Sequence, residues 1–570
     1  MSEQWSNEKL KFLGHEGHAL ALGGPGAGKT HVALVKARNH IRAGSLKPGQ
    51  KVLFLSFARA TVARILQKAS ELISRDELKR LEISTYHAFA WDILRSHAYL
   101  LTGRPQLRLL APPEAAAHLA SFPKHSREAE KMRLFIEDAT LDFDLFARMV
   151  AELLQSSGRL AELYGACYPV VILDEFQDTN ADEWAMIQQL GKGSRLLALG
   201  DPDQRIYEFR GADPRRLKEF ADAFSAKPFD FAGENHRSSG TDINTFGNDL
   251  LYGKNVGKAY QDVRVVKYGF INGKSPFFHP KTQVLSAFQR LKKLPEKSIA
   301  VLVPSRQLMV NLSAYLQSEL DGLPAIRHDV AMDVEAPALA AGVLAALMEG
   351  GPAHEATGRV LRALHSHIRG RRGSRPTPQP DLDLAEALSK FMLTGKVTGS
   401  KRKLVVSEVQ RVVAERGQLT MAGDAGVDWL RMRDMFAGCA VDVLTEVAKD
   451  VGFLRLLHRG SALRAGLGEL WRAQGHYGGA ESAVRSALVQ EQFAAVLRDW
   501  RGVHLMTIHK AKGKEFDEVI IYDGLHQRLV RNPEDEKAVA QERLALRVAV
   551  TRASRRATIL TPKKGSCPLL

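Results

Sequence analysis

Eight residues near the start of the chain have the types and spacing of a phosphate-binding loop. The stretch reads GGPGAGKT and fits the pattern G-x-x-x-x-G-K-[ST]. Glycines in such a loop let backbone N–H groups approach phosphate oxygens closely. The side chain of Lys29 can reach the terminal phosphates, and the Thr30 hydroxyl can bind Mg²⁺. The residues expected to hold a nucleotide are Gly23, Gly24, Pro25, Gly26, Ala27, Gly28, Lys29 and Thr30.

Two further polar segments follow apolar runs that are typical of buried strands. Asp174 and Glu175 come after PVVIL at 169–173, and Gln204 comes shortly after RLLAL at 195–199. Asp174 can bind Mg²⁺, and Glu175 can activate the water that attacks phosphorus. Two acids that simply end a strand are the alternative. Because parallel α/β sheets bind ligands beyond the carboxyl ends of their strands, we expect these groups to meet the phosphate loop.

The elements that must position these residues form an α/β pattern. A strand at 19–22 precedes the loop and a helix at 31–41 follows it, and further strands are expected at 51–57 and 81–85. A second set is expected at 299–303, 503–508, 518–522 and 557–560. Between the strands, 96–162 and 351–499 read as helical, and a separate buried helix is expected at 336–348, just before the second stretch. A basic, flexible linker is expected at 369–376.

Composition restricts the class of protein and its partners. The chain has 570 residues, enough for roughly three to four domains. Lys plus Arg number 80 against 64 Asp plus Glu, giving a formal charge of +16 that favours a nucleic-acid partner. The three cysteines lack metal-binding spacing, which predicts a reducing, cytoplasmic location. No apolar run approaches ~20 residues, so no membrane span is expected, and no signal peptide is visible.

Eight short motifs follow one another along the chain: GGPGAGKT (23–30), SFARAT (56–61), STYHAFA (84–90), LDEFQDT (173–179), GDPDQRIYEFRGA (200–212), ENHRSS (234–239), VHLMTIHKAKGKEFDEV (503–519) and ERLALRVAVTRA (542–553). In these motifs and in their order, the chain resembles the UvrD/Rep/PcrA family of superfamily 1 DNA helicases. The pair LDEFQDT and GDPDQRIYEFRGA is the most specific. The remaining stretches, 96–162 and 351–499, match the family's helical insertions by position only.

The resemblance implies an α/β fold with two RecA-like P-loop domains, built on parallel sheets and each interrupted by a helical insertion. The first core domain would comprise 1–95 and 163–232, and the second 233–350 and 500–570. It also implies roles at the ATP site. Gln204 would contact the γ-phosphate, Arg237 and Arg552 would act as arginine fingers, and Glu515 would lie near the nucleotide sugar. Planar guanidinium groups suit phosphoryl oxygens, so the arginine roles are chemically sensible.

For single-stranded DNA, the resemblance places aromatic residues under the bases and polar residues near the phosphates. The positions that match are Phe57, Thr85, Tyr86, His87, Tyr207, Phe209 and His509. Stacking aromatics bind bases without sequence preference. Core packing is the alternative for Phe57 and Tyr86, and a structural hydrogen bond is the alternative for the histidines.

The chain departs from the family pattern mainly around the nucleotide base. Lys9 stands near the position of the glutamine that reads adenine, and His236 replaces the tyrosine that stacks on the base. Arg547 stands where motif VI usually has an aromatic residue, and Phe209 replaces the commoner tryptophan. These changes predict looser nucleotide choice, while the phosphate-binding residues are intact.

The sequence therefore predicts an ATP- and Mg²⁺-dependent translocase on single-stranded DNA that acts as a 3′-to-5′ helicase. It is expected to act as a monomer on single-stranded and tailed duplex DNA, with a protein partner in a repair or defence complex left open. One alternative is a regulatory ATPase subunit, stimulated by nucleic acid, with little unwinding of its own. A P-loop GTPase or small-molecule kinase is a second alternative, but no N-K-x-D guanine motif is present.

Overall fold

The computed structural model describes residues 5–202, 213, 215–231, 240–331, 335–373, 376–458, 461–493 and 500–570. The chain divides into two compact units. Met1–His97, Phe146–Ala331 and Ala495–Leu570 form the first unit, and Ala98–Leu145 with Met332–Ala494 form the second. Both expected helical insertions thus contribute to one unit. Its boundaries at 98–145 and 332–494 differ from the expected 96–162 and 351–499.

The first unit contains a six-stranded parallel sheet that carries the phosphate loop. Its strand order is β3-β2-β6-β7-β1-β8. The strands are β1 Ala19–Leu22, β2 Val52–Ser56, β3 Leu81–Thr85, β6 Val170–Leu173, β7 Arg195–Gly200 and β8 Lys227–Asp230. The central strands are apolar and buried on both faces, as parallel sheets require. Helices on one face, led by α1 Asn7–Gly14, α2 Lys29–Arg42 and α3 Arg59–Leu72, share its core.

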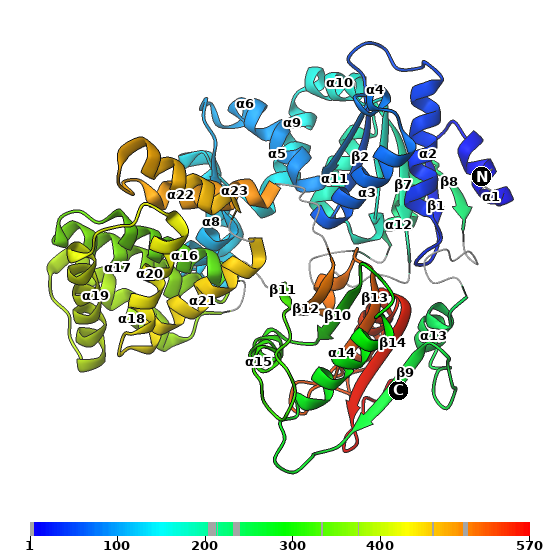
Figure 1. Ribbon diagram of the computed structural model, residues 1–570. Helices are drawn as coiled ribbons and strands as arrows, with labels where there is room; N and C mark the ends of the chain where they lie inside the picture. The colour runs from blue at the N-terminus through cyan, green and yellow to red at the C-terminus, as the bar shows by residue number, and fades with distance from the viewer. Residues whose placement is uncertain are drawn as a thin grey trace. The chain divides into compact units, whose positions relative to one another are not determined.

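The same unit contains a second six-stranded parallel sheet, ordered β11-β12-β10-β13-β14-β9. Its strands are β9 Val263–Tyr268, β10 Ser298–Val303, β11 Asp329–Ala331, β12 Gly502–Thr507, β13 Phe516–Tyr522 and β14 Ala553–Pro562. Figure 1 shows β9 in green beside β14 in red, two strands far apart in sequence. The predicted α/β class with parallel sheets is confirmed.

The remaining helices of the first unit connect and cover the two sheets. They are α4 Arg75–Leu78, α5 Tyr86–His97, α9 Phe146–Ser156, α10 Gly158–Cys167, α11 Ala181–Leu190, α12 Arg216–Phe224, α13 Ile243–Leu251, α14 Phe278–Arg290, α15 Arg306–Gln317 and α24 Glu536–Val550. Helices α9 and α10 belong to this unit rather than to an insertion, because α9 packs on α5 and α11 beside the first sheet.

The second unit is helical, with one small parallel pair of strands, β4 Arg108–Leu110 and β5 Thr140–Asp142. Its helices are α6 Tyr99–Thr102, α7 Pro112–Leu119, α8 Arg127–Asp138, α16 Glu335–Glu349, α17 Ala353–Gly370, α18 Gln379–Thr394, α19 Ser400–Gln418, α20 Ala425–Ala437, α21 Asp442–His458, α22 Ser461–Gln474 and α23 Ala480–Phe493. The alanine-rich α16 is buried on nearly all sides and forms the centre of the core, so the predicted buried helix is confirmed.

The prediction of a flexible basic linker at 369–376 is wrong for residues 369–373. Arg369 and Gly370 end helix α17, and Arg369 donates to the Ser121 hydroxyl at 2.6 Å. Arg371 pairs with Asp381 at 2.8 Å and also with Glu446. Each arginine thus has a fixed partner within the unit, which composition alone did not reveal.

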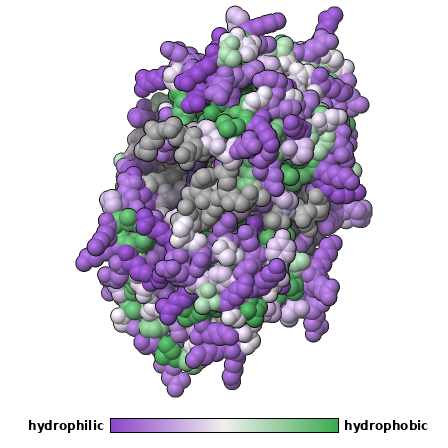
Figure 2. Space-filling view, turned by 90° about the vertical axis from the view of Figure 1, so that its right-hand side faces the viewer, coloured by the Kyte–Doolittle hydropathy of each residue, from purple (hydrophilic) through white to green (hydrophobic). Residues whose placement is uncertain are grey.

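The surface is polar where it can be seen. On the face drawn in Figure 2, hydrophilic side chains cover most of the surface and hydrophobic ones gather in small separate groups. Among the helices of the described residues, none is both long and apolar enough to cross a membrane.

Candidate nucleotide and nucleic-acid site

The phosphate loop joins β1 to α2 in the geometry that its sequence predicts. Gly26 and Gly28 have φ angles of 80° and 81°, in the left-handed region that favours glycine. Gly28 caps α2, whose first turn carries no acidic residue, so the positive helix end faces the loop. The ammonium group of Lys29 donates to the carbonyl oxygens of Gly23 at 2.5 Å and Gly24 at 3.1 Å. The loop thus closes around the lysine that would meet a phosphate.

The acid pair stands directly after β6. The backbone N–H of Asp174 donates to Leu55 O at 2.8 Å, and its carboxylate accepts from the Ser56 hydroxyl at 3.1 Å. Glu175 has a φ of 53°, a left-handed conformation that is uncommon for a residue with a side chain and is found at functional sites. The neighbouring strand β2 therefore fixes Asp174, while the turn after it aims Glu175.

Gln177 ties the acid pair to the next strand of the sheet. Its amide nitrogen donates to the Glu175 carboxylate at 2.6 Å, and its amide oxygen accepts from the backbone N–H of Asp201 at 3.1 Å. Asp201 directly follows β7, where the segment with Gln204 begins. Gln204 itself, with Tyr207, Phe209, His236 and Arg237, lies outside the described residues.

Burial and charge set the protonation of the two acids in opposite directions. Burial, reinforced by the adjacent Glu175 carboxylate, raises the pKa of Asp174. Burial would also raise the pKa of Glu175, but Lys512, Lys29 and the Gln177 hydrogen bond outweigh it and hold that pKa below its usual value. Glu175 is therefore an ionised carboxylate near neutral pH, the state that a general base needs.

The donor set at Asp174 and Thr30 fits Mg²⁺. Mg²⁺ is commonly bound through one or two carboxylates, with nucleotide phosphates and water completing its octahedral shell. Asp174 is buried and oriented by Ser56, and Thr30 lies in the first turn of α2, the helix that follows the loop. Among the described residues, no group of three or more His, Cys, Asp or Glu side chains is placed to hold a metal ion by itself.

Two cationic residues beside strands of the second sheet act on this acid cluster: Lys512 follows β12, and Arg552 directly precedes β14. Lys512 forms a buried ion pair with Asp178, four residues beyond Asp174. Burial and the carboxylates of Glu175 and Asp201 raise the pKa of Asp178 to about 7 against the opposing effect of Lys512. Arg552 is 2% exposed, and its charge helps to lower the pKa of Glu175. Of the two predicted arginine fingers, Arg552 thus lies at the acid cluster.

A second buried arginine, Arg547, lies near the phosphate loop. One guanidinium nitrogen is 3.8 Å from the Asp201 carboxylate, and the other donates to the Asn248 side chain at 3.2 Å. Lys512, Gln177 and the role of Ser56 were not predicted, and Arg547 was noted only as a departure. All four lie inside quoted motifs, so their position in those motifs was the available signal.

Glu515 lies on the α3 side of the site. Its carboxylate pairs with Arg64 at 3.1 Å, and Arg64 also donates to Gly513 O at 3.0 Å. Gly513 has a φ of 75°, and a Cβ there would lie 2.5 Å from the Thr61 hydroxyl. The turn at 513–515 therefore packs closely against the start of α3, the helix that follows Phe57.

The described residues expected to contact DNA differ in their exposure. Tyr86 is 1% exposed and packs on the half-buried Phe57, with ring centroids 4.6 Å apart. Tyr86 is therefore a core residue in this conformation, and of these two rings only that of Phe57 is accessible to a base. Thr85 accepts from the N–H of Ala88 at 3.0 Å and so caps α5. His87 and His509 are exposed, as a contact with a phosphate backbone requires.

Lys9 is not positioned as a free base-reading side chain. It is buried in α1, and its ammonium group lies 5.8 Å from the centroid of the Phe231 ring. Helix α1 is fixed to the loop helix by Lys36, which donates to the carbonyl oxygens of Phe12, Leu13 and His15 at 2.9, 3.0 and 2.6 Å. Three hydrogen bonds thus join the end of the N-terminal helix to the helix that follows the phosphate loop.

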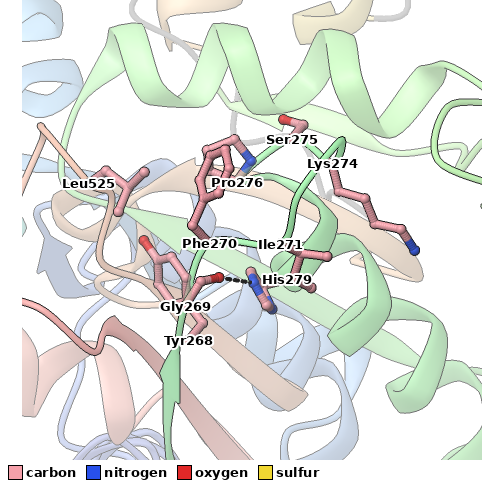
Figure 3. A pocket seen from close by; sticks show the side chains of 9 residues that line it. All are labelled: Tyr268, Gly269, Phe270, Ile271, Lys274, Ser275, Pro276, His279 and Leu525. Carbon is pink, nitrogen blue, oxygen red and sulfur yellow. Dashed lines mark hydrogen bonds between the residues drawn. The ribbon is translucent and has the colours of Figure 1, made fainter.

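A hollow at the end of β9 does not belong to this site. Figure 3 shows that Tyr268, Phe270, Pro276 and Leu525 surround it. The Nε2 atom of His279 lies 2.9 Å from the carbonyl oxygen of Gly269. No carboxylate lines it among the described residues, so it cannot supply the acid chemistry of phosphoryl transfer.

Two family models match the chain at the segments that build the site. Residues 5–135 and 130–225 match the UvrD/REP helicase N-terminal domain. Residues 483–564 match the UvrD-like helicase C-terminal domain. Together these ranges contain all the described site residues named above, apart from Asn248 and Phe231.

Curated relatives agree with these matches. The "ATP-dependent DNA helicase Rep" of Salmonella typhimurium is 26% identical over 267 residues, which is 39% of this chain and 40% of the relative. The "DNA helicase II" of Haemophilus influenzae is 26% identical over 41% of this chain and 38% of its own length. The "ATP-dependent DNA helicase PcrA" of Staphylococcus aureus is 23% identical over 41% of this chain and 38% of its length. The chain thus spans about two fifths of the relatives it matches.

Proposed function

Because the chain belongs to the UvrD/Rep family of superfamily 1 helicases, we propose that it is an ATP-dependent DNA helicase that moves along single-stranded DNA in the 3′-to-5′ direction. The observation that supports this most is the acid pair. The phosphate-loop lysine, Lys29, acts electrostatically on both Asp174 and Glu175, and Lys512 and Arg552, which flank strands of the second sheet, act on Glu175. A site that needs both sheets can couple hydrolysis to their relative movement.

Each residue of the site has a defined chemical task in this proposal. Lys29 and the N-terminus of α2 bind the terminal phosphates, and Thr30 and Asp174 hold Mg²⁺, which offsets phosphate charge when bound. Glu175 accepts a proton from the attacking water. Arg552 stabilises the charge that develops on the γ-phosphoryl oxygens. Gln204 and Arg237 keep the roles that their motifs imply at the γ-phosphate, and Glu515 that near the sugar.

Single-stranded DNA would cross the strand ends of both sheets. Phe57 offers a ring to a base, while Thr85, His87 and His509 offer polar groups to the backbone; Tyr86 supports Phe57 from below. Tyr207 and Phe209, in the segment after β7, would continue the stacking surface. The net charge of +16 favours this polyanionic partner, whatever its sequence.

The test is a steady-state ATPase assay with and without single-stranded DNA, followed by strand displacement on 3′-tailed and 5′-tailed duplexes. Glu175→Gln should retain nucleotide binding and lose about 10²- to 10⁴-fold in turnover, the usual contribution of a general base. Glu71→Gln, an exposed acid on α3, is the matched control and should behave as wild type. Near-normal turnover by Glu175→Gln would show that the base is another residue.

The assay also separates the proposal from the regulatory alternative. A helicase should show hydrolysis that rises with single-stranded DNA and unwinding of the 3′-tailed duplex alone. DNA-stimulated hydrolysis without strand displacement on either substrate would instead indicate an ATPase subunit that needs a partner.

A further inference from the structure

We propose that Arg547 is a third arginine that binds the terminal phosphate of the nucleotide, with Asp201 as its partner when no nucleotide is bound. This inference rests on the proposed function and names one more residue of its phosphate site. The role of Arg547 is inferred from its contacts in this structure. The family motif does not imply it, because motif VI usually has an aromatic residue at this position.

The first observation is the place of its guanidinium group. Arg547 is 2% exposed, and a Cβ built on Gly24 would lie 4.0 Å from its Nη2 atom. Lys29 donates to the carbonyl oxygen of that same Gly24 at 3.1 Å. The two cations therefore converge on one residue of the phosphate loop. Because the loop lysine meets the terminal phosphates, a cation at the same residue lies at that end of a nucleotide.

The second observation is how the side chain is held. Gly247 of α13 leaves room for its stem, because a Cβ there would lie 3.5 Å from Arg547 Cγ and 3.1 Å from Thr551 Cγ2. Asn248 then accepts a hydrogen bond from Nη2 at 3.2 Å. Helices α13 and α24 thus fix a buried cation in one orientation. A positioned guanidinium binds phosphate oxygens with less loss of side-chain entropy than a flexible one.

The third observation is the set of charged side chains around Arg547. Four carboxylates are linked through the contacts and pKa effects described above, namely Asp174, Glu175, Asp178 and Asp201. Four cations act on them, namely Lys29, Lys512, Arg547 and Arg552. Arg547 brings a buried guanidinium within 3.8 Å of the Asp201 carboxylate, and positive charge at this place favours the entry of a triphosphate. The 3.8 Å separation between Arg547 and Asp201 is longer than a hydrogen bond, so phosphate oxygens can compete with the carboxylate for this arginine.

The test compares equilibrium binding of fluorescent ADP and a fluorescent, non-hydrolysable ATP analogue to the full chain. Arg547→Ala should weaken binding of the ATP analogue about tenfold or more, and that of ADP less than about twofold, because only the analogue has a γ-phosphate. Arg547→Lys keeps the charge without the planar fork and should give an intermediate loss. Arg543→Ala, one turn earlier in α24, removes an arginine that donates to Leu250 O and is the matched control.

A purely structural role for Arg547 makes a different prediction. In that case the loss would come from the buried Asp201 carboxylate left without its partner, and Arg547→Ala with Asp201→Asn would restore analogue binding. Under our proposal the double variant regains thermal stability but still binds the analogue weakly. Equal losses for ADP and the analogue, no loss, or restoration of binding by Asp201→Asn would each overturn the inference. Failure of the wild type to bind either nucleotide would instead overturn the proposed function.

Discussion

Two glycines of the same helix should respond in opposite directions to a single added methyl group. Gly358 and Gly370 both lie in α17 of the helical unit. A Cβ at Gly358 would meet only the end of the Arg362 side chain at 3.7 Å. A Cβ at Gly370 would lie 2.6 Å from Leu339 Cδ1, 2.9 Å from the backbone nitrogen of Ala117 and 3.0 Å from Ala117 Cβ. The second site therefore has no room unless α7 or α16 moves.

The magnitudes follow from these distances. Gly358→Ala should stabilise the helical unit by about 0.5–1 kcal/mol, because alanine is the better helix former. Gly370→Ala should gain at most the same stabilisation from helix propensity, because Gly370 lies at the helix end. Overpacking against a backbone atom should destabilise this variant by about 1–3 kcal/mol. We expect a net destabilisation of about 1–2 kcal/mol, so the two variants should differ by roughly 2–3 kcal/mol.

Hydrogen exchange measured by mass spectrometry on the full chain tests this directly. Peptides from α16 and α17 should exchange faster in Gly370→Ala and slower in Gly358→Ala, while peptides from β1 and β6 serve as the internal reference. Equal protection of α16 and α17 in Gly370→Ala and Gly358→Ala would contradict the close packing of α7 on α17. It would also contradict the conclusion that the two insertions form one unit.

Three further predictions concern the first sheet. Tyr86→Phe should leave DNA binding unchanged and raise stability by about 1 kcal/mol, because the buried Tyr86 hydroxyl has no hydrogen-bond partner in the described part of the chain; a clear loss of DNA affinity in filter binding would assign that hydroxyl to DNA. Lys36→Met should lower the melting temperature markedly, since three carbonyl oxygens at the end of α1 lose their donor; an unchanged melt would show that α1 is held by other contacts. Asp178→Asn should flatten the pH dependence of stability. The pKa of Asp178 is about 7 in the native state against a usual 3.8, so the native state retains a proton that the unfolded chain releases. The stability of the wild type is therefore full below about pH 4 and falls by about 4 kcal/mol up to pH 7. A difference in melting temperature from wild type that is the same at pH 5 and pH 8 would contradict this last expectation.

The sequence predicted the parts of the fold whose signals are local. Strands β1, β2, β6, β7, β10, β12 and β13 are mainly apolar, although β12 includes His504 and β13 includes Asp517 and Glu518, and their observed bounds differ from the expected ones by at most two residues. Strands β8, β9 and β11 were not predicted. β8 begins with Lys227 and Pro228, and four of the six residues of β9 are not buried, so neither has the apolar run that marks a central strand.

Most of what could not be predicted depends on contacts between distant parts of the chain. Arg64 and Gly513 are 449 positions apart, and Lys512 and Asp178 are 334 apart. Periodicity and motif spacing report on neighbours in sequence, so they placed Asp174 and Glu175 correctly after a strand but could not name the cations facing them. The same limit explains the error at 369–373. Its basic composition suggested a linker, but the segment ends helix α17 and Arg371 forms ion pairs with Asp381 and Glu446.

The contacts around Glu175 suggest how DNA could influence hydrolysis in the proposed motor. Gln177 connects Glu175 to Asp201, which pairs with Arg547, while Lys512 pairs with Asp178 and lowers the pKa of Glu175. Lys512 follows the exposed His509 by only three residues, so a DNA backbone that contacts His509 acts on the segment that holds Lys512. A displacement of Lys512 would weaken its effect on Glu175 and leave the Asp178 carboxylate without its cation. Because Lys512 helps to keep the pKa of Glu175 low, its displacement would raise that pKa and reduce the fraction of ionised general base, which links the DNA surface to the phosphate site.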